Sequence, residues 1–124
     1  MELRVGPLTR TDIVRFAGAG GDFNPLHHDE EYARAAGFPS VFAMGQFQAG
    51  LLSRLAADWF GIENVRRYRV RLEAKVWPGD VLVLRGREVA REGDVVQCEL
   101  EAVREDGGEV AVRAWVRAIM MNDR

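Results

Sequence analysis

The chain has 124 residues, of which 48% are hydrophobic, and its formal net charge is −2 at pH 7. This length suits one domain with one core, and the lack of a basic excess argues against a nucleic-acid or anionic-membrane partner. No stretch has the apolar length of a signal peptide or a membrane helix, and the single cysteine, Cys98, lies in an alternating apolar pattern. We therefore expect a single domain over 1–124 that functions in the reducing cytoplasm.

The first half of the sequence has the periodicity of helices. After a short strand at 3–5, Thr9 or Thr11 can cap a helix that ends at the glycines before Asp22, and Asp29 can cap a second, short helix. The segment "GQFQAGLLSRLAADWFG" repeats apolar residues at four-residue steps. This pattern predicts a long helix that is buried around most of its girth.

The second half alternates apolar and polar residues, as strands do. The segments "YRVRLEAKV", "VLVLRGREVA", "VVQCELEAV" and "VAVRAWVRAIM" are separated by the turn signals "WPGD", "REGD" and "EDGGE". Successive strands without intervening helices pair antiparallel, which excludes a doubly wound sheet. The sequence predicts an α+β domain in which a curved antiparallel sheet wraps one long helix.

Both histidines of the chain lie in one loop, "GDFNPLHHD". Pro25 fixes its own φ and biases Asn24 away from helix, so the turn can aim Asp22 and His27 at one point. A carboxylate and an imidazole held in this way can share a water and transfer protons near neutral pH. A purely structural interpretation fits the residue types equally well. Asx-Pro turns are common, and in that case the loop has no chemical role.

Two other kinds of chemistry fit the loop less well. Adjacent His27 and His28 followed by Asp29 make a poor metal site, because neighbouring side chains rarely converge and no cysteine completes the set. Ser40 or Ser53 could be imagined in a Ser-His-Asp arrangement, but no nucleophile elbow is present. We expect neither a metal site nor a serine nucleophile.

Two stretches, "GDFNPLHHD" and "AGFPSVFAMGQFQAGLL", resemble the MaoC-like dehydratase and R-specific enoyl-CoA hydratase family. The family signature is a Gly-Asp-x-Asn-Pro-x-His loop followed by a His-Gly step that opens the central helix of a hot-dog fold. Since the loop, the helix and the run of strands all match, the resemblance implies one MaoC-like hot-dog domain over 1–124. It also implies that Asp22 and His27 are catalytic and activate or deliver water.

The resemblance assigns further residues to the site. The family glycine that opens the helix matches Gly45, whose backbone N–H is then the oxyanion hole for the thioester carbonyl. Asn24 and Met44 are expected to contact substrate, and Ser53 falls where some relatives have a polar group in the acyl pocket, although it is equally well a tolerated small helix residue. Met44 replaces the usual family histidine, so we expect a less polar wall and a changed acyl preference.

We therefore predict a lyase of fatty acid metabolism that reversibly hydrates trans-2-enoyl thioesters of CoA or acyl carrier protein to (R)-3-hydroxyacyl thioesters. No metal or redox cofactor is expected, because the thioester carbonyl itself acidifies the α-carbon. The alternatives are a hot-dog acyl-CoA thioesterase and a non-catalytic hot-dog subunit of a heteromeric dehydratase. The resemblance also implies a homodimer, a dimer of dimers, or a heterodimer with a second hot-dog chain.

Overall fold

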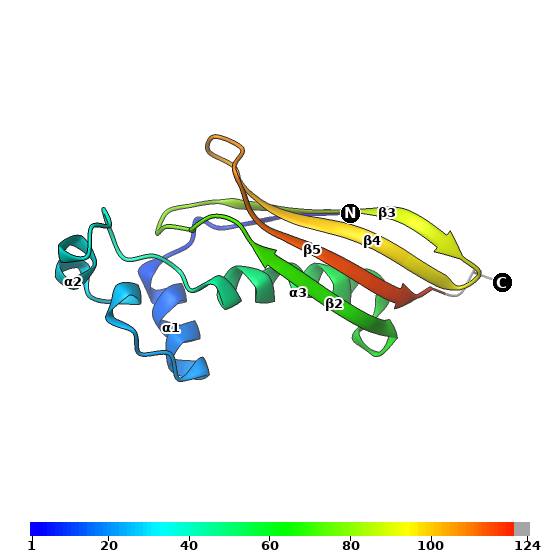
Figure 1. The fold of residues 1–124 in the computed structure, drawn as a ribbon, viewed down its shortest axis with the longest axis horizontal. Coiled ribbons are helices and arrows are strands. Elements are labelled where there is room, and N and C mark those ends of the chain that lie inside the picture. The colour runs from blue at the N-terminus through cyan, green and yellow to red at the C-terminus, as the bar shows by residue number, and fades with distance from the viewer. Residues whose placement is uncertain (121–124) are drawn as a thin grey trace.

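The computed structural model describes residues 1–120, which form one long helix against a five-stranded sheet (Figure 1). The elements follow one another as β1 (Glu2–Val5), α1 (Arg10–Gly20), η1 (Pro25–His27), α2 (Glu30–Ala35), α3 (Gly45–Phe60), η2 (Ile62–Asn64), β2 (Val65–Leu72), β3 (Leu82–Glu92), β4 (Val95–Arg104) and β5 (Val110–Ile119). The predicted α+β class is confirmed. Within residues 1–120, no helix is long and apolar enough to cross a membrane.

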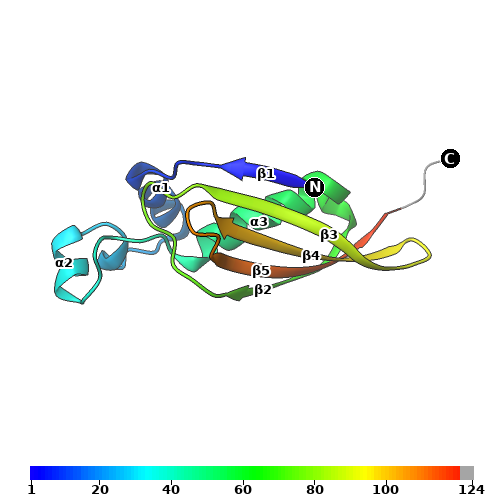
Figure 2. The same ribbon diagram turned by 90° about the horizontal axis from the view of Figure 1, so that it is seen from above.

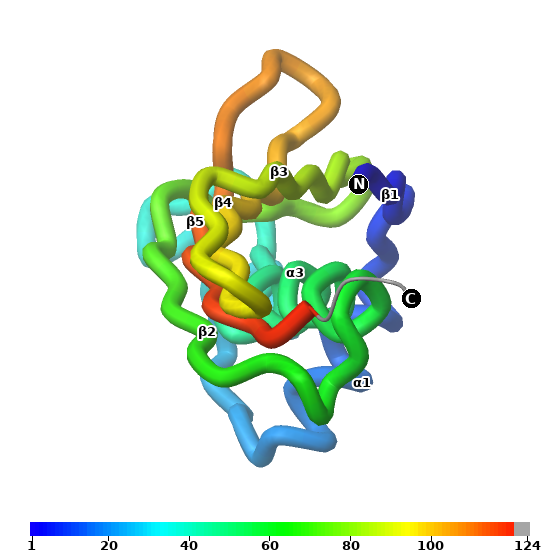
Figure 3. The backbone as a smooth tube through the Cα atoms, turned by 90° about the vertical axis from the view of Figure 1, so that its right-hand side faces the viewer, coloured from blue at the N-terminus to red at the C-terminus, as the bar shows by residue number. Residues whose placement is uncertain are grey.

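The sheet has the strand order β1-β3-β4-β5-β2, and all neighbouring strands are antiparallel. Figure 2 shows the strands side by side in this order with α3 lying along one face. Seen from the end, the sheet curls around α3 (Figure 3). The predicted arrangement of one helix wrapped by a curved sheet is therefore confirmed.

The core lies between α3 and the inner face of the sheet. Alternate residues of β4, among them Cys98 and Leu100, are buried there against Leu52 and Leu55 of α3. The prediction that α3 is buried around most of its girth is confirmed. Only one stripe of the helix is exposed, and its other residues are buried or half-buried; the exposed residues are Gln46, Gly50, Arg54 and Asp58.

The connection from β2 to β3 begins earlier than the sequence suggests. The alternating segment 68–76 predicts a strand to Val76, but β2 ends at Leu72. The N–H groups of Glu73 and Ala74 both donate to the carbonyl of Ala111, which ends the regular ladder. Val76 then accepts a hydrogen bond from the N–H of Ala43 at 2.9 Å. The connection therefore packs against the segment that leads into α3.

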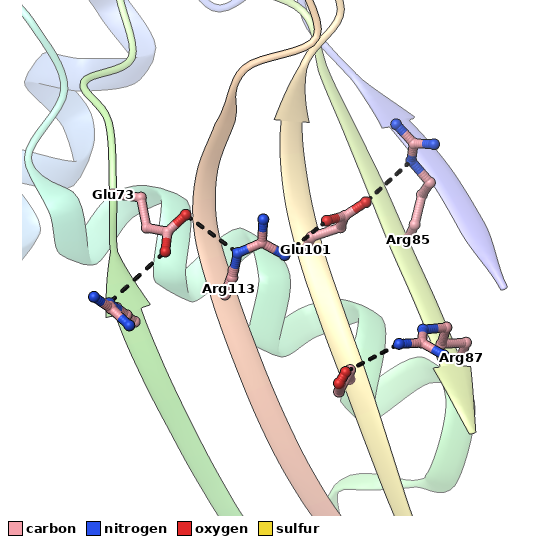
Figure 4. Close-up of polar contacts among 7 residues, drawn as sticks. Glu73, Arg85, Arg87, Glu101 and Arg113 are labelled. Atoms are coloured by element: carbon pink, nitrogen blue, oxygen red, sulfur yellow. Dashed lines mark hydrogen bonds and ion pairs between the residues drawn. The ribbon is translucent and has the colours of Figure 1, made fainter. Parts of the chain in front are cut away.

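The outer face of the sheet carries rows of ion pairs across neighbouring strands (Figure 4). Three of these contacts join residues that the register places opposite one another: Arg85–Glu101, Arg113–Glu101 and Arg87–Glu99. The fourth joins Arg113 to Glu73, which follows the end of β2. Because these side chains are largely solvated, each pair adds little stability. The row nonetheless occupies the carboxylate of Glu73, which borders the cavity described next.

Candidate active site

The end of α1 places Asp22 at the start of the loop that carries the family motif. Helix α1 starts with a capping box between Thr9 and Asp12, and it stops at Gly21, whose φ of 72° is the left-handed conformation that glycine adopts without strain. The N–H of Asp22 donates to the carbonyl of Ala17 at 2.9 Å. The backbone of Asp22 is therefore fixed by the helix that precedes it.

Asn24 closes the turn between Asp22 and His27. Its side-chain Oδ1 accepts a hydrogen bond from the N–H of Leu26 at 3.0 Å, and its own N–H donates to Asp22 Oδ1 at 3.2 Å. Pro25 begins the one-turn helix η1, where its missing N–H is not needed. Asn24 thus builds the loop through its N–H and its Oδ1, and the contact between Asn24 and substrate stays a prediction.

His27 is held in one tautomer by the backbone of the segment before α3. The residue is 7% exposed, and its Nδ1 lies 2.7 Å from the carbonyl oxygen of Phe42. Because a carbonyl only accepts, Nδ1 carries the hydrogen, and the neutral ring presents a lone pair at Nε2. The edge of the ring also packs against the side chain of Phe42. In the neutral ring, Nε2 of His27 is therefore the acceptor nitrogen, and the contacts with Phe42 fix its direction.

Asp22 and His27 face one another, as the motif predicts. Asp22 Oδ2 lies 3.6 Å from His27 Nε2, and the Asp22 side chain is 42% exposed. This separation is too long for a direct hydrogen bond but suits two groups that bind the same water. The two side chains can therefore take a proton from one molecule and return a proton to it.

A cavity of about 340 Å³ opens beside His27. It is lined by the first turn of α3, the segment before it and the connection after β2: His27, Phe42, Ala43, Met44, Gly45, Gln48, Leu72, Glu73, Ala74 and Lys75. Met44 is buried in this wall, as predicted. Ser53 is not: it lies outside this set, and its hydroxyl donates to the carbonyl of Gly50. The structure gives no support to an acyl-pocket role for Ser53.

Gly45 presents a free donor to this cavity. It is the first residue of α3, and within residues 1–120 its N–H has no hydrogen-bond acceptor. Met44 provides no side-chain cap, so the positive end of the helix dipole is also open. A Cβ at position 45 would overlap Leu72 Cδ1, so any other residue here would have to displace the Leu72 side chain. The N–H is well placed to stabilise an oxyanion.

The charged groups around the cavity differ in the partners that hold them. Glu73 is held by Arg113 and Arg71, at 3.2 and 3.7 Å. The ammonium of Lys75 lies over the ring of Phe42, 5.4 Å from its centre. Asp22 Oδ2, in contrast, faces only His27. Among the carboxylates near the cavity in residues 1–120, Asp22 is therefore the one without an arginine partner.

Sequence reasoning missed Gln48, Leu72 and Lys75 as residues of the cavity wall. The sequence does mark Gln48 as unusual, because it is a polar residue among the buried positions of α3. Lys75 is the only lysine of the chain. His28 is exposed, and no group of three potential metal-binding side chains occurs in the described part of the chain.

Known structures share this architecture. The unliganded R-hydratase PhaJ1 from Pseudomonas aeruginosa superposes with a TM-score of 0.87 at 21% identity, covering 99% of this chain and 80% of the hydratase. A structure of the ChsH1–ChsH2 complex from Mycobacterium tuberculosis gives a TM-score of 0.84 at 26% identity, covering 97% of this chain and 93% of the matched one. The hot-dog fold is therefore confirmed.

The sequence has matching relatives as well. The 3-hydroxyacyl-thioester dehydratase X of Mycobacterium tuberculosis is 37% identical over 70 residues, which cover 56% of this chain and 24% of that protein. Four curated relatives are matched over only 8% to 52% of their own length. The family model for the MaoC like domain matches residues 4–113. With the loop, the helix and the sheet all in place, this chain belongs to the MaoC-like dehydratase family.

Proposed function

We propose that the chain catalyses the reversible hydration of a trans-2-enoyl thioester to the (R)-3-hydroxyacyl thioester. The observation that carries this proposal is the Asp22–His27 pair, whose facing atoms lie 3.6 Å apart beside the cavity that contains the free N–H of Gly45. Hydration needs proton transfer at carbon and charge stabilisation at oxygen. The Asp22–His27 pair can transfer the protons, and the N–H of Gly45 can stabilise the charge.

In this reaction, a water bound between Asp22 and His27 gives one proton to the pair while its oxygen bonds to C3 of the enoyl group. The electrons of the C2=C3 bond move toward the thioester oxygen and form an enolate. The N–H of Gly45 stabilises this charge, and the pair then delivers a proton to C2. The two residues act as one unit, so we assign the proton transfers to the pair.

The thioester carbonyl serves as the electron sink of this reaction, so we propose that no resident cofactor is used. The carrier is CoA or acyl carrier protein. A relative described as a 3-hydroxyacyl-thioester dehydratase supports the thioester class. The open cavity of about 340 Å³ has space for a short acyl group together with the end of its carrier arm.

We also propose that the chain acts as a dimer. Strand β2 is an edge of the sheet, so its outer hydrogen-bonding groups are available to a second chain. Leu72 at the end of this strand is 51% exposed although it borders the cavity. Pairing across β2 would cover this edge and close the cavity. A second hot-dog chain could take the same place, since a similar solved structure is a ChsH1–ChsH2 complex.

Hydration and hydrolysis assayed side by side test this function. Short, medium and long trans-2-enoyl-CoA substrates are incubated with the purified chain, and the enoyl absorbance and free thiol are both recorded. Loss of enoyl absorbance without thiol release is expected. Thiol release would instead identify a thioesterase. Light scattering on the same samples gives the oligomeric state, and an inactive homodimer would indicate a missing partner chain.

A further inference from the structure

Gln48 is a buried polar residue that has no partner. The residue is 2% exposed, and its Oε1 is fully enclosed without a hydrogen bond. Within residues 1–120, no other group bonds to this carboxamide either. A buried amide without a partner destabilises the fold, which is why such groups are rare in folded proteins. An apolar side chain at this position of α3 would avoid that cost.

The position of Gln48 in α3 directs its carboxamide toward the start of the helix. It lies three residues after Gly45 and therefore on the same side of the helix. Side chains of α-helices tilt toward the N-terminus and cover the preceding turn. Gln48 accordingly lines the same cavity as Gly45 and His27. The unpartnered amide and the unpartnered backbone N–H thus border one space.

The bound thioester offers a partner for both groups. Its oxygen becomes negatively charged in the enolate, and one N–H from Gly45 satisfies only part of the hydrogen-bonding capacity of that oxygen. The unbonded carboxamide can rotate to present its NH₂ group, because no contact fixes which end faces the cavity. In a buried site a donor of this kind is worth more than in water.

We propose that Gln48 is a catalytic residue whose side-chain NH₂ donates a second hydrogen bond to the thioester oxygen, beside the N–H of Gly45. This role rests on the proposed hydration reaction. The charge that Gln48 stabilises is formed when water adds to C3 and is lost when C2 takes its proton. Gln48 therefore acts mainly on the transition state, and its removal lowers kcat more than it raises KM.

Gln48→Met tests this role, because methionine has a similar length and cannot donate. Gln46→Met is the matched control, since Gln46 is on the same turn but exposed. We expect Gln48→Met to lower kcat by about 100-fold with KM changed less than threefold, and to leave the thermal midpoint equal or higher. Gln46→Met should retain wild-type kinetics. A kcat of Gln48→Met within threefold of wild type would overturn the proposal.

A binding measurement separates this inference from the proposed function. Butyryl-CoA labelled with ¹³C at the carbonyl cannot be hydrated, and its C=O stretching band moves to lower frequency with each hydrogen bond. We expect a smaller shift on Gln48→Met than on the wild type and on Gln46→Met. Equal shifts on all three would refute the contact with Gln48. If the wild type shows the shift but hydrates no enoyl-CoA, the proposed function fails while the contact stands.

Discussion

Replacing His27 by asparagine and by glutamine separates its structural role from its chemical role. Asparagine can place an N–H near the position of Nδ1 and keep the hydrogen bond to the Phe42 carbonyl, which is 2.7 Å away in the wild type. Glutamine reaches toward the position of Nε2 and leaves that carbonyl without its donor. Neither amide accepts a proton at neutral pH. Both variants should therefore lose catalysis, whereas only glutamine should lose much stability.

The expected sizes follow from these contacts. Loss of positioned proton transfer lowers the hydration rate by about 100-fold or more in both variants. An unpaired buried carbonyl lowers the free energy of unfolding by about 1–3 kcal/mol in His27→Gln, which shifts Tm by roughly 3–6 °C per kcal/mol at this chain length. Enoyl-CoA hydration and thermal unfolding measure the two effects. A His27→Asn variant with more than about a tenth of wild-type activity would refute the assignment of Nε2 as a proton acceptor.

Three further predictions concern other residues. Asp22→Asn should lower the hydration rate by about 100-fold at nearly unchanged Tm, because its side chain is 42% exposed and an amide cannot accept the proton of water; a near-wild-type rate would exclude Asp22 from the pair. Gly45→Ala should reduce the hydration rate, because a Cβ there meets Leu72 and displaces it toward the cavity. The double variant Gly45→Ala/Leu72→Ala should then recover part of the lost rate, and no recovery would show that displaced Leu72 is not the obstruction. Burial raises the pKa of the Cys98 thiol to about 11, whereas the unfolded chain has the ordinary value near 9. Thiol ionisation should therefore lower the free energy of unfolding as pH rises from about 9 to 11. Urea titrations should show a smaller decline over this range for Cys98→Ala than for the wild type, and an equal decline would contradict the prediction.

The sequence predicts those parts of the fold that depend on local chemistry. Thr9 and Asp29 cap their helices as expected, because a hydroxyl or carboxylate followed by open backbone donors is a local signal. The end of β2 at Leu72 was not predicted. The alternation continues to Val76, and the strand ends only because the backbone of 73–74 turns to bond Ala111, a contact distant in sequence.

The same limit applies to the site. The spacing of Asp22 and His27 indicates that they face one another, since a proline turn joins them. The partner of His27 Nδ1 is the carbonyl of Phe42, and a backbone oxygen carries no sequence signal. The importance of Gln48 depends on its lack of a partner, which becomes visible only when its neighbours are placed. Local motifs therefore predict the chemical groups, whereas the tertiary structure decides their surroundings.

The proposed catalytic groups and the other side chains of the cavity are held in different ways. Three backbone carbonyls tie the motif loop, the segment before α3 and the connection after β2 together: Leu26 to the N–H of Phe42, Phe42 to His27, and Val76 to the N–H of Ala43. These bonds fix His27 and the start of α3 without using a side chain of the cavity wall other than His27 itself. The side chains of Met44, Leu72 and Lys75 line the cavity from this frame, and within residues 1–120 they form no hydrogen bond or ion pair. Substitutions among them can therefore change which acyl group fits while the proton-transfer pair and the Gly45 donor keep their places.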